Sequence, residues 1–383
     1  MKAQHILAMA LLLGAVACNK EPAFETIPKE ASGETGILSI ILAGDDVGTK
    51  ALTAYTEAID YETKVNSVQL LIFNGDGDLV KDARFTSSFT SMQTSIPTGT
   101  YTVWAIVNDY LEYVYNEWEI YDEFMAYISV LDDNSISGKS FVMSGSASCT
   151  VKANTTSSCP ISVKRLVGRV ALNSVKFNLP KGYDIYLDYA YLSNVCGKCL
   201  YDGNALSSDY YYDMWEFPYW LNYDGYQSLP ADPEDDFYIQ TSRKKITGAS
   251  TAQLPALTAF DFGFCEMGVS DTWTRDDDDF SHVLFYGYPN CSTRNPSGPH
   301  TYFEDQKTCL VVVADIYSGY GNGGTNYYVI PLDSFEANKT YTIDLTITGF
   351  GTDDPNKPVE KGTVNASITV SGWSSGQVID KTI

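Results

Sequence analysis

The sequence predicts a mainly all-β protein with few short helices, and three observations support this prediction. Runs such as 68–73 and 363–370 are rich in apolar and β-branched residues, and many alternate with polar residues at the strand period of two. Turn residues separate the runs, as in the Asn-Gly-Asp-Gly sequence at 74–77. Only residues 121–134 have a clear helical period, carried by Phe124, Tyr127, Ile128 and Leu131. We therefore expect strands throughout and one short helix.

The N-terminus predicts export. Residues 1–17 begin with Lys2, continue with an apolar run and end in small residues before Cys18, which is the layout of a secretory signal peptide. The cysteine directly after the small residues makes the segment resemble a bacterial lipoprotein signal, so Cys18 is the predicted lipidation site. An ordinary signal followed by an unrelated cysteine is the alternative. Residues 18–35 are polar and without an apolar period, which predicts a tether.

The composition excludes several classes of partner. The formal net charge is −23, which argues against nucleic acid and anionic lipid because binding to phosphate needs the opposite sign. Of eight cysteines, seven remain besides Cys18, and this odd number leaves at least one without a partner in the chain. Cys196 and Cys199 have a metal-binding spacing but no second ligand pair at matching spacing, so we expect no metal and no cofactor.

The first predicted strand, residues 37–43, has two apolar faces. Leu38, Ile40 and Leu42 point to one side, and Ile37, Ile41 and Ala43 point to the other with Ser39. A polar loop that contains Lys50 follows. A single proteolytic cut in this loop would separate a predicted core strand from the rest of the chain. The sequence therefore raises the question of what purpose this position of the strand serves.

Later segments extend the β pattern. Residues 96–108 predict a turn and then a strand that is covered on both faces, and 308–317 predict another strand. The long run 161–180 is expected to leave one sheet and enter another, which marks a domain junction. In the C-terminal strand an apolar face is formed by Val364, Ala366, Ile368 and Val370. Residues 374–383 look extended, without a turn to return them.

The sequence gives no sign of enzyme chemistry. His282 and His300 are the histidines beyond the signal, and neither lies in a His-Glu-x-x-His frame; no Gly-x-Ser-x-Gly elbow or phosphate-binding glycine loop is present. Paired carboxylates from distant strands leave no local pattern and stay open. The stretch 209–226 is rich in aromatic residues, including Trp215, Tyr219 and Trp220. Packing within the protein and binding of a carbohydrate or protein both explain it.

Several segments together resemble the fimbrillins, the lipoprotein-derived pilins of adhesive fimbriae. They are the signal before Cys18, GILSIILAGDDVGTKAL (36–52), LLIFNGDGDLV (70–80), IPTGTYTVWAIVN (96–108), VKRLVGRVAL (163–172) and, most specifically, residues 338–373. The resemblance implies two tandem β-sandwich-like (transthyretin-like) domains, at 36–168 and 169–383.

The resemblance also implies an assembly route. The subunit reaches the outer membrane as a lipoprotein, a trypsin-like protease cuts between Lys50 and Ala51, and the strand 37–43 is lost. Fimbrillins are usually cut at Arg, and this chain has Lys at the matching place. The groove then accepts the C-terminal segment of another subunit, a donor expected within 363–383. Its side chains are Val364, Ile368, Val370, Val378, Ile379 and Ile383. The expected partners are other subunits joined head-to-tail in a fimbrium at the cell surface.

Two alternatives stay open. A fimbrial tip subunit needs only the groove and carries a binding loop such as 209–226 for a host protein or glycan receptor. A monomeric glycan-binding surface lipoprotein keeps residues 37–43 in its sheet permanently. In that case Lys50 is an ordinary surface residue.

Overall fold

The computed structural model is nearly all β, which confirms the predicted fold class. It describes residues 33–42, 62, 64–86, 89, 91–108, 121, 125, 128–131, 134, 140–193, 195–196, 198–204, 220–221, 259–274, 283–289, 308–353, 359–360, 362–373 and 380–382. Within these ranges no helix is long and apolar enough to cross a membrane.

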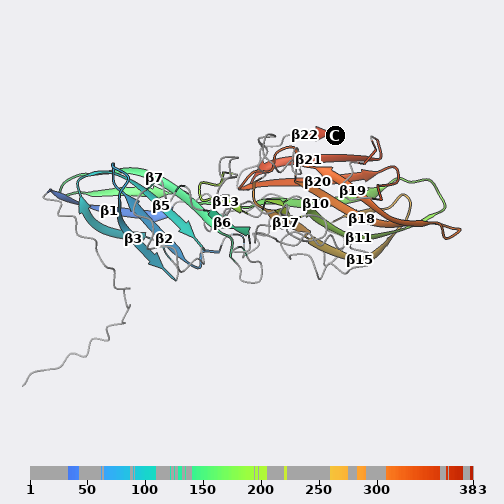
Figure 1. The fold of residues 1–383 in the computed structure, drawn as a ribbon, viewed down its shortest axis with the longest axis horizontal. Helices are drawn as coiled ribbons and strands as arrows, with labels where there is room; N and C mark the ends of the chain where they lie inside the picture. The colour runs from blue at the N-terminus through green and yellow to red at the C-terminus, as the bar shows by residue number, and fades with distance from the viewer. Residues whose placement is uncertain are drawn as a thin grey trace, which may run out of the picture. The chain divides into compact units, whose positions relative to one another are not determined.

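Two sheets form the first sandwich (Figure 1). The three-stranded sheet has the order β4-β1-β8, and the five-stranded sheet has the order β3-β2-β5-β7-β9. The strands are β1 (Thr35–Leu42), β2 (Val68–Phe73), β3 (Leu79–Phe85), β4 (Ser91–Pro97), β5 (Gly99–Val107), β7 (Met143–Val151), β8 (Thr156–Ile161) and β9 (Lys164–Arg165). Side chains from both sheets, among them Leu38, Leu70 and Val103, form one buried apolar core between them. On the other face of β5, Trp104 and Ile106 are also buried, so this strand is covered on both faces as predicted.

A larger core lies between two further sheets, the second sandwich. One has the order β16-β10-β20-β21-β22 with β17 paired to β10, and the other has the order β15-β11-β18-β19. The strands are β10 (Gly168–Phe177), β11 (Tyr183–Ser193), β15 (Ala259–Met267), β16 (Thr272–Thr274), β17 (Leu284–Gly287), β18 (Cys309–Ser318), β19 (Gly323–Pro331), β20 (Lys339–Ile347), β21 (Val364–Gly372) and β22 (Asp380–Thr382). The strand predicted at 308–317 is therefore present as β18.

The run 161–180 changes sheets as predicted. Its first part, β9, pairs with β7 in the first sandwich, whereas β10 pairs in parallel with β20 in the second. The larger core also includes Phe73 and Trp104 from the first sandwich, and residues 31–383 form one compact unit. The domain limits 36–168 and 169–383 therefore stay a prediction.

The helix predicted at 121–134 is wrong for its second half. Tyr121 and Met125 are helical, but Ile128–Val130 form the strand β6, which pairs antiparallel with β13 (Lys198–Leu200). β-Branched Ile and Val favour strands, and a partner distant in sequence satisfies the backbone groups here. A second short pair joins β12 (Val195–Cys196) to β14 (Trp220–Leu221).

The turn after β2 follows the sequence closely. Asn74 Oδ1 accepts hydrogen bonds from the backbone N–H groups of Asp76 and Asp78, and Gly77 has a φ of 87°. Glycine adopts this left-handed conformation without steric cost, so the sequence encodes the turn between β2 and β3 directly.

Candidate functional site

The strand β1 lies in the middle of its sheet. It pairs antiparallel with β4, from Thr35 opposite Pro97 to Ile41 opposite Ser91, and parallel with β8, from Ile37 to Leu42. Both edges of β1 are therefore hydrogen-bonded. Because neighbouring strands lie about 4.8 Å apart, removal of β1 leaves a slot about 10 Å wide between β4 and β8. We refer to this space as the β1 slot.

The apolar side chains of β1 alternate between core and solvent, and Ser39, on the outer face, is 9% exposed. Leu38 and Ile40 are 0% exposed in the first core, whereas Ile37 and Ile41 are each 41% exposed. Leu42 is partly buried and packs against the same core. The predicted division into two faces is confirmed, and Leu38, Ile40 and Leu42 form the inner one. Loss of β1 uncovers side chains that each contribute about 1.5–3 kcal/mol when fully buried, and it leaves two rows of backbone groups without partners.

The strands β4 and β8, which form the two walls of the β1 slot, are attached to the rest of the sandwich in different ways. β4 continues into β5 through the single residue Thr98, so the five-stranded sheet anchors it directly. β8 has β1 as its one neighbour in the strand order that the described residues define. Backbone contacts at the start of β1 are also close. Gly36 lies against the carbonyl of Lys152 in the turn before β8, where a Cβ atom would clash.

The expected donor segment divides into two parts. β21 pairs with β20 over its whole length, Lys339–Ile347 with Val364–Gly372, and Ile368 is buried in the second core. Val364 and Val370 pack against that core and are partly buried. In this chain β21 is therefore part of the second sandwich, and the donor limits of 363–383 stay a prediction.

The chain also returns after Trp373. β22 runs antiparallel to β21, with Ser367 opposite Thr382 and Thr369 opposite Asp380, so the expectation of a tail without a returning turn is wrong. Pairing to the free edge of β21 satisfies backbone groups that the local sequence leaves open. Val378, Ile379 and Ile383 lie outside the described residues.

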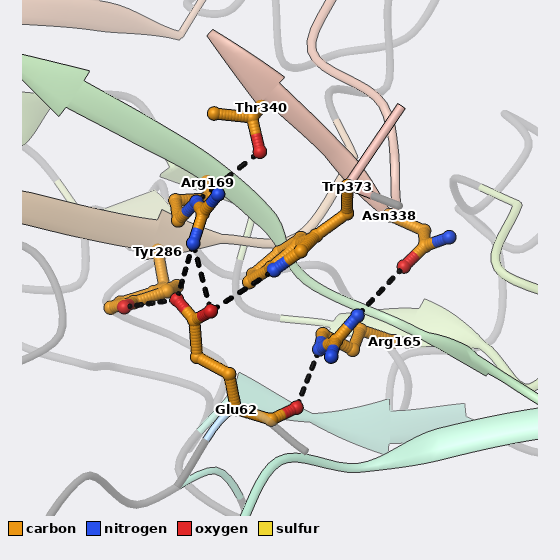
Figure 2. A network of polar contacts seen from close by, with 7 residues as sticks. All are labelled: Glu62, Arg165, Arg169, Tyr286, Asn338, Thr340 and Trp373. Atoms are coloured by element: carbon orange, nitrogen blue, oxygen red, sulfur yellow. Dashed lines mark hydrogen bonds and ion pairs between the residues drawn. The ribbon is translucent and has the colours of Figure 1, made fainter. Parts of the chain in front are cut away.

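A buried polar cluster surrounds Trp373, the last residue before the C-terminal segment 374–383 (Figure 2). Glu62, which is 2% exposed, accepts hydrogen bonds through both carboxylate oxygens from Arg169 at 2.8 Å. Tyr286 donates to Glu62 Oε1 at 2.8 Å, and Trp373 Nε1 donates to Oε2 at 3.1 Å. Arg169 also donates to the hydroxyl of Thr340 at 3.2 Å. The carboxylate is thus fully paired, as a buried charge requires.

Two guanidinium groups stack on the same indole. Arg165 and Arg169 each lie 4.7 Å from the ring centroid of Trp373. Arg165 donates to the backbone oxygen of Glu62 at 2.6 Å and to Asn338 Oδ1 at 3.4 Å. The cluster therefore connects Glu62, which lies between the Lys50 loop and β2, to the base of the C-terminal tail.

Other predicted site residues lie outside the described part of the chain. These are Cys18, Lys50, Ala51, Trp215 and Tyr219. The backbone of Trp220 is placed in β14 opposite Cys196, and its side chain is not described. Among the described residues, no group of three or more His, Cys, Asp or Glu side chains is arranged to hold a metal ion.

Comparison with solved structures shows what this fold is. A candidate cell adhesion protein from Bacteroides eggerthii DSM 20697 matches with a TM-score of 0.57 at 18% identity, over 91% of this chain and 98% of that chain. A fimbrilin from Porphyromonas gingivalis W83 matches with a TM-score of 0.56 at 13% identity, over 89% and 98%. The chain has a fimbrillin-like fold. A candidate cell adhesion protein from Parabacteroides distasonis ATCC 8503 shares the same fold, with a TM-score of 0.55 at 17% identity over 89% and 99%.

Comparisons by sequence add no family. No family model matches the chain, and no curated protein matches it. The fimbrillin-like fold therefore rests on tertiary structure.

Sequence reasoning missed Glu62 entirely. Its neighbours are polar, and nothing local distinguishes it from a surface carboxylate. Arg165 and Arg169 could have indicated the cluster, because they stand within the apolar run 161–180. A buried cation there needs an acidic partner.

Proposed function

We propose that this chain is a fimbrial structural subunit of the fimbrillin family that supports cell adhesion. It is exported as an outer-membrane lipoprotein through Cys18, trimmed between Lys50 and Ala51, and polymerised by donor-strand exchange. The central place of β1 between β4 and β8 carries this proposal, because its removal opens a slot with hydrogen-bonding edges on both sides. The similarity to a fimbrilin and to candidate cell adhesion proteins supports it.

The donor that we propose is the segment 374–383 of a second subunit. β21 is an unsuitable donor because its departure would unpair β20 and expose Ile368. The terminal strand β22 pairs through three residues at the edge of the sheet, so its release breaks few contacts. Ile379 and Ile383 lie on the same face of an extended strand and supply apolar side chains for the inner face of the β1 slot, whereas Val378 points to the other face.

The contact between subunits is head-to-tail and does not close, so it propagates into a filament. Trimming releases the lipid together with β1, which transfers the subunit from the outer membrane to the fimbrium. The chemistry is association only, and we propose that the chain is not an enzyme. Hydrolysis of a glycan or peptide by the purified chain would contradict this part.

Limited trypsin treatment of the folded protein tests the route. We expect a new N-terminus at Ala51 and ladders of polymer that resist SDS. A Lys50→Gln variant should stay intact and monomeric, which ties the ladders to this cut. A variant that ends at Trp373 should be trimmed but fail to form long ladders, and mixed with trimmed wild-type chains it should end their growth. A trimmed wild-type chain that stays monomeric would contradict the proposal.

One observation favours a tip subunit as the second candidate. β22 pairs with its own β21, and a subunit that keeps its tail accepts a strand without giving one. A tip adhesin or a monomeric glycan-binding lipoprotein would bind glycans through the aromatic stretch 209–226. Glycan-array binding that is lost in Trp215→Ala or Trp220→Ala, with Tyr320→Ala as an exposed aromatic control, would support this candidate.

A further inference from the structure

Two cysteines face each other across the first core. Cys149 lies on β7 in the five-stranded sheet and Cys159 lies on β8 in the three-stranded sheet. Both are buried in the same apolar cluster, β7 and β8 pack on each other, and each thiol lies close enough to shift the pKa of the other. A turn at 152–155 connects the two strands, so the pair lies a short distance along the chain as well as in space.

We propose that Cys149 and Cys159 form a disulfide in the exported chain, which joins the two sheets of the first sandwich. An export route takes the protein to an oxidising compartment, where disulfides form and persist. The contact between the two thiols distinguishes this pair from a lone buried cysteine, whose usual role is apolar packing.

The chemistry is thiol–disulfide exchange with an oxidised protein disulfide carrier. One thiolate attacks a sulfur of the carrier, forms a mixed disulfide and displaces the other carrier sulfur as a thiolate. The second cysteine then attacks the mixed bond and releases the carrier as a dithiol. Two protein thiols lose two protons and two electrons, and the carrier disulfide accepts them.

The two thiols differ in acidity. The hydrogen bond from Cys159 lowers the pKa of the Cys149 thiol, and the same contact together with burial raises the pKa of Cys159. In the folded, reduced chain, Cys149 is therefore the more acidic of the two thiols. Since both side chains are buried in the finished fold, the bond forms while β7 and β8 are folding.

The disulfide has a consequence for the β1 slot, and this part rests on the proposed function. Cys159 is the parallel partner of Ile40 in β1, so it lies in the wall of the slot. When β1 leaves, β8 loses its neighbour in the three-stranded sheet. A covalent link to β7 holds β8 in place, so the spacing between β8 and β4 is preserved until a donor strand binds.

Peptide mapping of the exported protein tests the bond directly. Trypsin cuts after Lys139, Lys152 and Lys164, so the two cysteines fall in separate peptides, 140–152 and 153–164. We expect these peptides to be linked when the denatured protein is alkylated and digested without reductant, and to separate after reduction. The same chain made without residues 1–17 in a reducing cytoplasm is the control, and both of its thiols should be alkylated. Recovery of both peptides as alkylated monomers from the exported chain would overturn the inference, as would a link to another cysteine.

Variants test the role in the β1 slot. After trimming, the Cys149→Ser/Cys159→Ser double variant should lose polymer relative to wild type, whereas Cys265→Ser on β15 should polymerise normally. Equal polymer yield from the double variant would overturn the role in the slot. Linked peptides in a chain that never polymerises would contradict the proposed function and leave the disulfide standing. Free thiols in a chain that does polymerise would contradict only the inference.

Discussion

At the scale of residues, the polar cluster around Glu62 buries several charged groups together. A carboxylate and two guanidinium groups are buried together with Trp373 and Tyr286. Each charge is costly to bury, and the hydrogen bonds and the two cation–π contacts compensate that cost. The loss of one member therefore leaves the others uncompensated.

Glu62→Gln should destabilise the protein strongly, because Arg169 then keeps a buried charge without its counter-ion. We expect a loss of about 3–5 kcal/mol in the free energy of unfolding, measured by urea denaturation. Glu360→Ala, at an exposed carboxylate, is the matched control and should change stability by less than about 0.5 kcal/mol. Similar values for the two variants would show that the cluster does not stabilise the fold.

Buried tyrosines predict alkaline sensitivity. Burial raises the pKa of Tyr341 to about 12, because the phenolate is poorly solvated in the core. The folded state therefore holds this proton more tightly than the unfolded chain, whose tyrosine pKa is about 10. Stability from Tyr341 is fully present below pH of about 10 and is lost as the pH rises toward 12.

Unfolding measured between pH 9 and 12 should show this loss, and a Tyr341→Phe variant should lose less stability over the same interval. An equal slope in both proteins would contradict the assignment to Tyr341. Because burial also raises the pKa of Tyr189 and Tyr328, the variant should reduce the slope without abolishing it.

At the scale of elements, the two faces of β1 have different surroundings. The inner face completes the core, and the outer face keeps Ile37 and Ile41 half exposed. Alternation along the sequence predicted these faces, because side chains in any strand point to opposite sides. The place of β1 within its sheet was not predicted, since strand order depends on partners far away in sequence.

Leu38→Ala should destabilise the untrimmed protein and have no effect on the trimmed protein. In the untrimmed chain we expect a loss of about 2–5 kcal/mol, because a buried side chain is replaced by a cavity. After cleavage at Lys50 the variant and wild type should be identical in polymer yield and stability, since β1 is no longer present. Ile41→Ala on the outer face is the control and should cost much less in the untrimmed chain. A Leu38→Ala defect that persists in finished polymer would show that β1 is retained.

Ile368→Ala in β21, unlike Leu38→Ala, should destabilise the chain both before and after trimming. Ile368 is buried in the second core, so both trimmed and untrimmed chains should lose about 2–5 kcal/mol in urea denaturation. Asn365→Ala, on the exposed face of the same strand, should have little effect. If Ile368→Ala reduced the polymer yield without reducing monomer stability, β21 would instead be part of the donor strand.

At the scale of the whole molecule, the proposed trimming would convert a complete sandwich into one that needs a second chain. In the untrimmed chain, β1 itself pairs with both β4 and β8 and fills the slot. The trimmed subunit gains stability by mass action from any strand that fits the slot. In the proposed route, this coupling would restrict polymerisation to chains that have already been cut.

A synthetic peptide with the sequence of residues 374–383 should raise the melting temperature of trimmed monomer in dilute solution. The rise should increase with peptide concentration and be absent for a scrambled peptide and for untrimmed protein. Scanning calorimetry measures the effect. A peptide that leaves trimmed monomer unchanged would place the donor elsewhere.

The sequence by itself determined the local features of this protein: that runs such as 68–73 and 308–317 form strands, which faces of β1 and β21 are apolar, and where the turn at Asn74 lies. These follow from side-chain alternation and turn chemistry, which act over a few residues. The tertiary structure alone decided that β1 is central, that Ile128–Val130 form a strand, that β22 returns to β21, and that Glu62 meets Arg169 and Cys149 meets Cys159. Each of these brings different strands or loops together, and most of the partners are far apart in the sequence. Such contacts depend on the packing of whole sheets, and no local pattern encodes them.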